Sequence, residues 1–416
     1  MTSRILTIVL IGLYFFSLLT FPSERVLDVN SWRLFLTGCL NLFALSFILL
    51  EPKMKSNLNV TLKSKISIVI GLYFLWAIAS YFYAINPTEV LVRSIFIFNF
   101  YITFNVFYVF LKFLDLSEKQ IAYFFLISAV IHIYPSLTNY IEITSVEPYN
   151  NNFNKEIMGF YFNRNITSFV YLFHLQFVLF ISIQVKNILI KVISIITSFL
   201  IIFIIFILAS RAAILTLILL ILIYLGSFIY EKKQIKDFFK SQVGILFSTA
   251  FLAFCLSIAN LDSNNNANPV NRISSISIEE QSTNGRLRYY SQAIDLFYSN
   301  PIKGIGLGNW KIKSIETDNE NILSYIIPYT VHNDFLENAV ELGIVGLILF
   351  MLIFIYPISK AIKLYFKYKN PFTLSLICLL VIYLVDSNLN FPAIRSSQLF
   401  FLAVFINLIY LNKENN

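Results

Sequence analysis

The chain has 416 residues, of which 57% are hydrophobic and 13% are charged, and its mean hydropathy is +0.73. A soluble globular domain carries roughly twice that charged fraction, so the composition excludes this class of protein. The formal net charge of +8 does not indicate a nucleic-acid partner. In a membrane protein the placement of the basic residues matters more than their sum.

Apolar blocks of about 17 to 25 residues recur along the chain, and each is long enough to cross a bilayer as a helix. Twelve are predicted, near residues 5–21, 34–50, 66–84, 94–113, 120–138, 166–185, 188–209, 212–230, 242–260, 336–358, 371–387 and 396–412. The two blocks beside Ser210 can also be read as one broken hairpin. The first block resembles a signal peptide, but it is long for one and ends without a small-residue cleavage site, so we expect a membrane helix.

These blocks predict an all-α polytopic membrane protein with about 12 transmembrane helices in a single integral membrane domain, residues 1–416. One long polar loop, residues 261–335, is inserted between the ninth and tenth predicted helices and is expected to carry short helices. If the N-terminus is cytoplasmic, 18 of the 31 basic residues lie in inner loops and 13 in outer ones, six of the latter in the long loop. This bias follows the positive-inside rule and places both termini in the cytoplasm and the long loop on the outer face.

Arginine and lysine are segregated between the two sides. The inner set holds 17 lysines and one arginine, whereas the outer set holds four lysines and nine arginines. The outer arginines are Arg25, Arg33, Arg93, Arg164, Arg211, Arg272, Arg286, Arg288 and Arg395. A planar guanidinium binds phosphate or carboxylate oxygens better than an ammonium does, so the pattern favours an anion site on the outer face. The alternative is that outer loops simply differ in composition.

Arg211 lies in ILASRAAIL, between two apolar runs. A cation at membrane depth is costly and usually faces a cavity or a partner, so we favour an anion ligand. The alternative is a side chain that reaches the lipid headgroups.

The segment after Asn284 predicts a short surface helix that ends at Asn300-Pro301. Its apolar stripe, expected to pack against the membrane domain, comprises Leu287, Tyr290, Ile294 and Phe297. Arg286 would lie in the first turn, where free backbone amides favour an anion, and Arg288 points elsewhere and is a weaker candidate. The following glycine run, Gly304, Gly306 and Gly308, fits a tight turn as well as a phosphate loop.

His332 precedes a helix whose cap is expected to be Asn333 or Asp334, with Glu337 completing a D-x-x-E capping pattern. A polar stripe at the start of this helix should face the protein interior or a wet cavity; it comprises Asp334, Glu337, Asn338 and Glu341. Beside a helix N-terminus His332 should be neutral and able to accept a proton, although a lone loop histidine is more often inert. The other two histidines, His132 and His174, are interpreted as polar core residues.

Three motifs in this order resemble the O-antigen ligase family and its related polymerases: SRAA (210–213), GRLRYYSQAIDLFYSNPIKGIGLGNW (285–310) and VHNDFLENAVELGIVG (331–346). GFYFNRNITSF (159–169) also resembles the family's asparagine-containing segment, with Asn165 in the matching position. The resemblance extends from about residue 159 to the C-terminus. Two positions depart from the family pattern: Tyr290 stands where tryptophan is usual, and Arg164 where proline or histidine is common.

The resemblance implies a glycosyltransferase of the polytopic GT-C type in the bacterial inner membrane. Such enzymes take a glycan from an undecaprenyl-diphosphate carrier at the periplasmic face and attach it to an acceptor, typically lipid A-core oligosaccharide. It assigns catalysis to His332 and diphosphate binding to Arg211 and Arg286. The residues expected to contribute to substrate binding are Arg288, Asn165, Asn333, Arg164 and Glu341. No metal or cofactor is expected.

Three alternatives remain open at this point. A polysaccharide polymerase would use the same donor with a carrier-linked repeat unit as acceptor, and the motifs separate it poorly from a ligase, which we favour. A lipid-linked protein glycosylase is a further variant. A flippase would also explain the arginines, but transporters often show internal repeats, and none is evident here.

Overall fold

The computed structural model describes residues 2–22, 28–259, 281–318 and 328–412, and within these ranges the protein is helical and contains no strand. Each of the twelve predicted membrane helices coincides with one observed helix. Ten are long and apolar enough to cross a membrane, and the first and last are shorter apolar helices. The predicted all-α fold of a polytopic membrane protein is therefore confirmed. Arg25, Arg272 and Lys413 lie outside the described residues.

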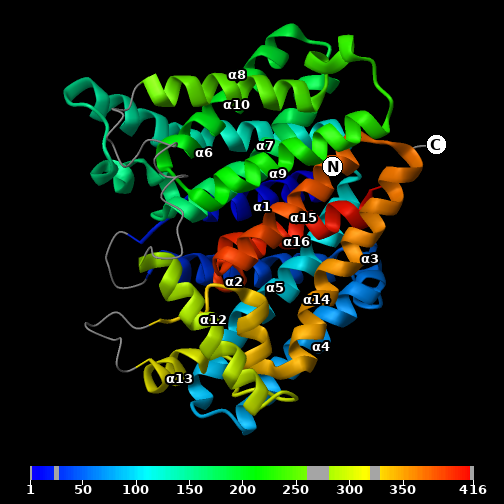
Figure 1. Ribbon diagram of the computed structural model, residues 1–416. Coiled ribbons are helices and arrows are strands. Elements are labelled where there is room, and N and C mark those ends of the chain that lie inside the picture. The colour runs from blue at the N-terminus through cyan, green and yellow to red at the C-terminus, as the bar shows by residue number, and fades with distance from the viewer. Residues whose placement is uncertain (1, 23–27, 260–280, 319–327, 413–416) are drawn as a thin grey trace. The chain divides into compact units, whose positions relative to one another are not determined.

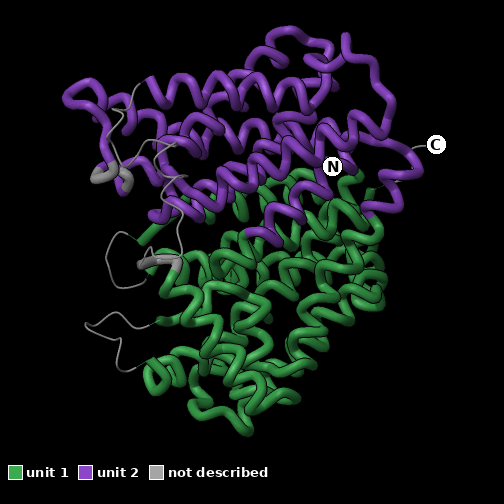
Figure 2. Tube along the Cα trace, in the orientation of Figure 1, with its two compact units in different colours: residues 1–115, 278–360, 386–413 green, residues 116–277, 361–385, 414–416 purple. Residues whose placement is uncertain are grey.

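The chain folds as two compact units (Figure 2). Unit 1 comprises residues 1–115, 278–360 and 386–413, and unit 2 comprises residues 116–277, 361–385 and 414–416. The helices of unit 1 are α1 (Thr2–Ser17), α2 (Val29–Leu50), α3 (Pro52–Leu62), α4 (Lys65–Ala79), η1 (Ser80–Phe82), α5 (Pro87–Leu114), α12 (Gln281–Ser299), α13 (Trp310–Thr317), η5 (Pro392–Ile394) and α16 (Ser396–Leu411). In this unit α5 is central and packs against α2, α3, α4 and α16 (Figure 1).

The helices of unit 2 are α6 (Glu118–Val146), η2 (Asn151–Tyr161), α7 (Arg164–Gln184), α8 (Ile188–Leu208), α9 (Arg211–Tyr230), η3 (Ile235–Lys240) and α10 (Gln242–Ala259). Two long helices pass from one unit to the other, α14 (Asp334–Tyr368) and α15 (Pro371–Leu389). In unit 2 α7 packs against α6, α8 and α10, and every side chain from Thr167 to Ser182 is buried. A helix that is apolar on all sides is expected to be enclosed in this way.

Short polar residues begin most of the helices. Asn86 accepts a hydrogen bond from the Thr88 amide at the start of α5, and Asn187 caps α8 in the same way. Ser117 and Gln120 form a capping box at the start of α6. These caps satisfy amides that have no partner in the first turn, and they fix the helix starts within otherwise uniform apolar sequence.

The structure corrects two helix predictions. The expected loop between residues 50 and 66 contains α3, which buries Met54, Leu58 and Thr61 at helical spacing despite its lysines. The helix predicted at 336–358 is longer and is broken at Gly343, which has φ 66° and ψ −167°. Only glycine adopts this backbone conformation without strain, so α14 consists of a short polar segment followed by a long apolar one.

The two histidines in unit 2 are buried core residues. The Ser128 hydroxyl lies 2.9 Å from His174 Nε2 and 3.3 Å from His132 Nδ1, and the Tyr161 hydroxyl lies 2.9 Å from His132 Nε2. His132 and His174 are 2% and 0% exposed. Their polar atoms thus meet other polar atoms of the same core, which is the usual arrangement for buried polar groups.

We expect Gly343→Ala to lower the thermal unfolding midpoint of the detergent-purified protein. The backbone conformation alone should cost about 1–3 kcal/mol with a side chain, and a Cβ atom would overlap the carbonyl oxygen of Ile302. Gly226→Ala is the matched control, because a Cβ atom at this position inside α9 has no other atom within 4 Å. An unchanged midpoint for Gly343→Ala would contradict the proposed break in α14.

Candidate functional site

His332 lies in a tight turn immediately before α14. Its φ of 63° is left-handed, a conformation that costs a residue other than glycine roughly 1 kcal/mol or more. Asn333 follows and caps the helix, because its side-chain oxygen accepts hydrogen bonds from the amides of Phe335 and Leu336 at 3.0 and 3.1 Å. Of the two predicted caps, Asn333 is therefore the one used, and its side chain is committed to the helix start.

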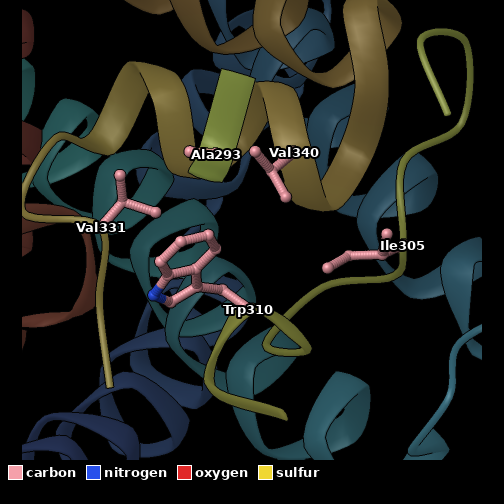
Figure 3. Close-up of a cluster of buried hydrophobic side chains, with 5 residues drawn as sticks. All are labelled: Ala293, Ile305, Trp310, Val331 and Val340. Carbon is pink, nitrogen blue, oxygen red and sulfur yellow. The ribbon is translucent and has the colours of Figure 1, made fainter. Parts of the chain in front are cut away.

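The turn is anchored on both sides of the histidine. The Val331 amide donates a 2.9 Å hydrogen bond to Glu337 Oε2, so Glu337 holds the turn before the helix and does not complete the predicted box with Asp334. The Val331 side chain is fully buried with Ala293, Ile305, Trp310 and Val340. Figure 3 shows these five side chains gathered in one cluster.

The His332 ring packs edge-on against Phe391, with ring centroids 5.1 Å apart. The Tyr290 hydroxyl, on α12, donates to the His332 carbonyl at 3.2 Å and is also 3.1 Å from the carbonyl of Asn388. Among the described residues, His332 Nδ1 is enclosed and has no hydrogen-bond partner. The imidazole is therefore positioned by its backbone and by an aromatic neighbour, without a side-chain hydrogen bond that would fix its tautomer.

Burial, together with the positive charges of Arg286 and Arg395, lowers the pKa of His332 to about 4. A neutral imidazole agrees with the prediction for His332. The cause is burial and the charges of two arginines, whereas the sequence pattern attributed the neutral state to the N-terminus of the following helix. Between pH 6.5 and about 4 an unfolded histidine takes up a proton that the folded one does not. This group therefore lowers stability as the pH falls through that window.

Arg286 lies in the second turn of α12, because the helix already begins at Gln281. The predicted cap at Asn284 and the predicted first-turn position are wrong. Asn284 and Gly285 weaken a helix by no more than about 1 kcal/mol each, which does not prevent it from running through them. Arg286 precedes Tyr290 by four residues, so both share the helix face that Ala293 continues into the cluster.

The apolar stripe predicted for α12 is partly wrong. Leu287 and Ile294 are 46% and 41% exposed, whereas the fully buried residue is Ala293. Tyr290 and Phe297 pack beside it as predicted. The sequence pattern does not reveal the burial of Ala293, because alanine carries little hydrophobic signal. Its small side chain nevertheless lets α12 approach its neighbours closely.

Arg288 is held in an ion pair. Its Nε atom lies 2.7 Å and its Nη2 atom 2.9 Å from the carboxylate of Asp318, which is 1% exposed. Gln292 donates to the same carboxylate at 3.0 Å. The bidentate pair joins α12 to the end of α13, so Arg288 is committed to this packing.

The predicted polar stripe on α14 is buried. Three of its carboxylates accept hydrogen bonds from backbone amides of three different segments: Asp334 from Ala393 at 3.1 Å, Glu337 from Val331, and Glu341 from Trp310 at 2.9 Å. The fourth residue, Asn338, accepts from the Tyr73 hydroxyl at 2.6 Å. The stripe therefore joins several loops of unit 1 to the first segment of α14. Glu341, which was predicted to bind substrate, accepts a hydrogen bond from the Trp310 amide.

A pocket in unit 1 is lined by the stripe and by Arg93, Leu307 and Ile394. Arg93 Nη2 lies 3.6 Å from Glu337 Oε1. Arg93 is one of the nine outer arginines, and the sequence predicts no role for it, because a charge in an apolar helix is its only signal. Within the described residues, no group of three or more His, Cys, Asp and Glu side chains is placed to hold a metal ion.

The glycine run forms a turn that packs against α14 and η1. The amides of Ile305 and Gly306 donate to the carbonyls of Val340 and Glu341 at 3.0 and 2.8 Å, and the Leu307 amide donates to Ser80. A Cβ atom at Gly308 would lie 2.8 Å from Arg93 Cγ. Since these amides already have partners, the run is a packing element of unit 1, and the turn reading is the one the structure favours over a phosphate loop.

In unit 2 the predicted site residues gather at two helix starts. Asn163 caps α7 by accepting from the amides of Asn165 and Ile166, and Arg164 is the first residue of the helix. Ser210 precedes Arg211, the first residue of α9, and donates to the Asn165 side-chain oxygen at 2.9 Å. Two helix N-termini, each with an arginine at its first position, are thereby joined by a hydrogen bond.

We expect Arg395→Gln to raise the pKa of His332 from about 4 towards 6.5, because a nearby positive charge disfavours the imidazolium ion. The measurement is the pH dependence of diethyl pyrocarbonate labelling of His332, followed by peptide mass spectrometry. Arg288→Gln is the matched control, since Arg288 is paired with Asp318 and is not among the charges that act on His332. Equal labelling curves for Arg395→Gln and wild type would refute this account.

A comparison with protein families matches residues 196–351 to the O-antigen ligase family. Among curated proteins, a sequence search finds no match to this chain. The matched region contains Arg211, Arg286, His332 and Glu341, whereas Arg164 and Asn165 precede it. At the level of the family, the match supports a glycosyltransferase-like enzyme. Residues 196–351 of this multi-pass membrane protein therefore match the O-antigen ligase family as a domain.

Proposed function

We propose that this protein is an O-antigen ligase that transfers a glycan from an undecaprenyl-diphosphate carrier to lipid A-core oligosaccharide. The proposal places it in the bacterial inner membrane with both termini cytoplasmic and the reaction at the periplasmic face. The observation that supports it most is His332, a neutral imidazole held in a strained turn within the matched region. Strained backbone of this kind is often found where a side chain must be presented for chemistry.

His332 acts in this proposal as the general base. Its Nδ1 atom is enclosed, so we assign the proton to Nδ1 and proton acceptance to Nε2. The acceptor hydroxyl gives its proton to Nε2 while its oxygen attacks the anomeric carbon. The bond from that carbon to the diphosphate oxygen breaks, and undecaprenyl diphosphate leaves with the electron pair. A base that is neutral at the working pH is available for this step in almost every molecule.

The leaving diphosphate needs positive charge, and we assign this role to Arg286 and Arg211. Arg286 acts on the same imidazole that would accept the proton, which supports its proximity to the reacting groups. Arg211 begins a helix, where the backbone amides add to the attraction for an anion. We assign Asn165 and Arg164 to the same anion-binding end of unit 2. Asn333 and Glu341, whose side chains hold the turn and α13, then orient the site without touching substrate.

Single variants test these roles in a reconstituted transfer assay with purified donor and acceptor. We expect His332→Ala to lower kcat by about 10²–10⁴-fold, the usual contribution of a general base. Arg286→Lys should also be impaired, because an ammonium does not replace the planar fork on a diphosphate. Arg288→Gln is the matched control on the same helix, and near wild-type transfer by His332→Ala would refute the proposal.

Direct displacement predicts inversion at the anomeric carbon, which NMR of the product reports. Retention would exclude the single-step route through His332. Because arginines supply the positive charge, we also expect transfer to continue in EDTA. A rate that is lost with EDTA and restored by Mg²⁺ would contradict this assignment.

A gene deletion separates ligase from the alternatives on a gel. Free lipid A-core together with long carrier-linked polymer supports a ligase, and single repeat units on lipid A-core indicate a polymerase. Repeat units that remain in the cytoplasmic leaflet would indicate a flippase.

A further inference from the structure

Arg93 is a largely enclosed arginine to which the proposed reaction gives no role. It lies near the start of α5, its side chain is 13% exposed, and its Nη2 atom is 3.6 Å from Glu337 Oε1. Gly308 lies against its aliphatic stem, because a Cβ atom there would be 2.8 Å from Arg93 Cγ. The guanidinium lies within ion-pair distance of Glu337, and its charge also acts on the carboxylate of Glu341.

Glu337 divides its two oxygens between two partners. Oε1 faces Arg93, and Oε2 accepts the Val331 amide at 2.9 Å. A buried carboxylate that loses its cation is left with an uncompensated charge, and it avoids this cost by taking up a proton or by moving towards water. Either response weakens the hydrogen bond to Val331. The ion pair thus keeps Glu337 in the state that holds the turn.

Val331 directly precedes His332. Its side chain is fixed in the cluster around Trp310, and its amide is fixed by Glu337. A rotation of the backbone at Val331 would move the imidazole of His332. The backbone of His332 is already strained, with φ of 63°. The chain of contacts therefore runs from Arg93 through Glu337 and Val331 to His332.

We propose that Arg93 is a positioning residue for His332, acting through the carboxylate of Glu337 and the backbone amide of Val331. This inference rests on the proposed function for its effect on transfer. The effect of Arg93 on the position of the imidazole does not depend on whether His332 is the base. A purely structural role for the ion pair is the competing interpretation.

Steady-state kinetics of the full-length protein test the effect on transfer. Arg93→Leu should lower kcat by about 10- to 100-fold, because small displacements of a catalytic group are costly, while KM for the carrier-linked donor changes little. Arg93→Lys keeps the charge and should retain most of the activity. The double variant Arg93→Leu/Glu337→Gln should be faster than Arg93→Leu alone, since no unpaired charge is buried and the amide oxygen still accepts from Val331.

Labelling of His332 by diethyl pyrocarbonate tests the position of the ring without the reaction. The chain has three histidines, and the other two are buried in unit 2, so peptide mass spectrometry isolates this one. Arg93→Leu should increase the labelling rate at neutral pH several-fold and raise its pH midpoint. Arg286 and Tyr290 from α12 and Arg395 before α16 also face His332. Arg93 acts on Arg395 as well, so the labelling rate at neutral pH, and not the pH midpoint, reports the release of the ring.

Glu89→Gln is the matched control. Glu89 lies one turn before Arg93 on α5 and pairs with Lys311 at 2.6 Å, so it joins α5 to the start of α13 without a link to Val331. It should leave kcat and labelling at wild-type values even if it lowers the unfolding midpoint.

The outcomes separate the two proposals. If Arg93→Leu lowers the unfolding midpoint but leaves kcat and labelling equal to those of Glu89→Gln, the positioning role is overturned and the proposed function stands. If His332→Ala transfers normally, the proposed function is overturned, and the labelling rate alone decides whether Arg93 positions the ring.

Discussion

The hydrogen bond from the Val331 amide to Glu337 is the contact on which the arrangement around His332 depends. It lets α14 hold the turn that precedes it, because the Glu337 side chain in the first turn of the helix reaches back to the Val331 amide, six residues earlier. Val331 is then free to bury its side chain, Asn333 to cap the helix, and His332 to occupy the strained position between them. A turn held by solvent alone would relax out of this conformation, since roughly 1–3 kcal/mol of strain must be offset by surrounding contacts.

Acidic and basic side chains around this turn have different partners. Three carboxylates of α14 accept from backbone amides of separate segments, so each offsets the cost of its burial by ordering a loop. The positive charges of Arg286 and Arg395 act on the imidazole and, together with its burial, keep the ring uncharged. Acidic groups thus build the frame of unit 1, and basic groups set the state of its histidine.

The helices could be predicted from the sequence because each apolar block is long and the polar residues between blocks are caps. The start of α12 could not be predicted in this way. The residues around Asn284 permit both a cap and a continuing helix, and tertiary packing decides between them. The break at Gly343 was hidden for the same reason: a glycine in an apolar run is compatible with a straight helix until a neighbouring carbonyl, that of Ile302, fills the space of its Cβ atom.

The candidate residues were found where a residue type is rare in its surroundings, as with His332 and Arg211. Roles that depend on distant contacts were not accessible. Arg288 could not be assigned to Asp318, nor Arg93 to Glu337, because their partners are 30 and more than 200 residues away along the chain. For Glu341 and Asn333 the sequence showed polar groups in the right region, but only the fold shows that backbone amides occupy them.

The break in α14 also has a mechanical consequence. Membrane helices tilt to match the thickness of the surrounding lipid, and a continuous helix would transmit that tilt along its whole length. Gly343 interrupts the candidate span Asp334–Tyr368 between its polar segment, which holds the histidine turn, and its apolar segment. The Ile344 amide, next to the break, donates a hydrogen bond to the carbonyl of Pro301. The break is therefore anchored to the segment that leads into the glycine run. The apolar segment can therefore follow the lipid while the imidazole keeps its place, which insulates the geometry of the site from the composition of the bilayer.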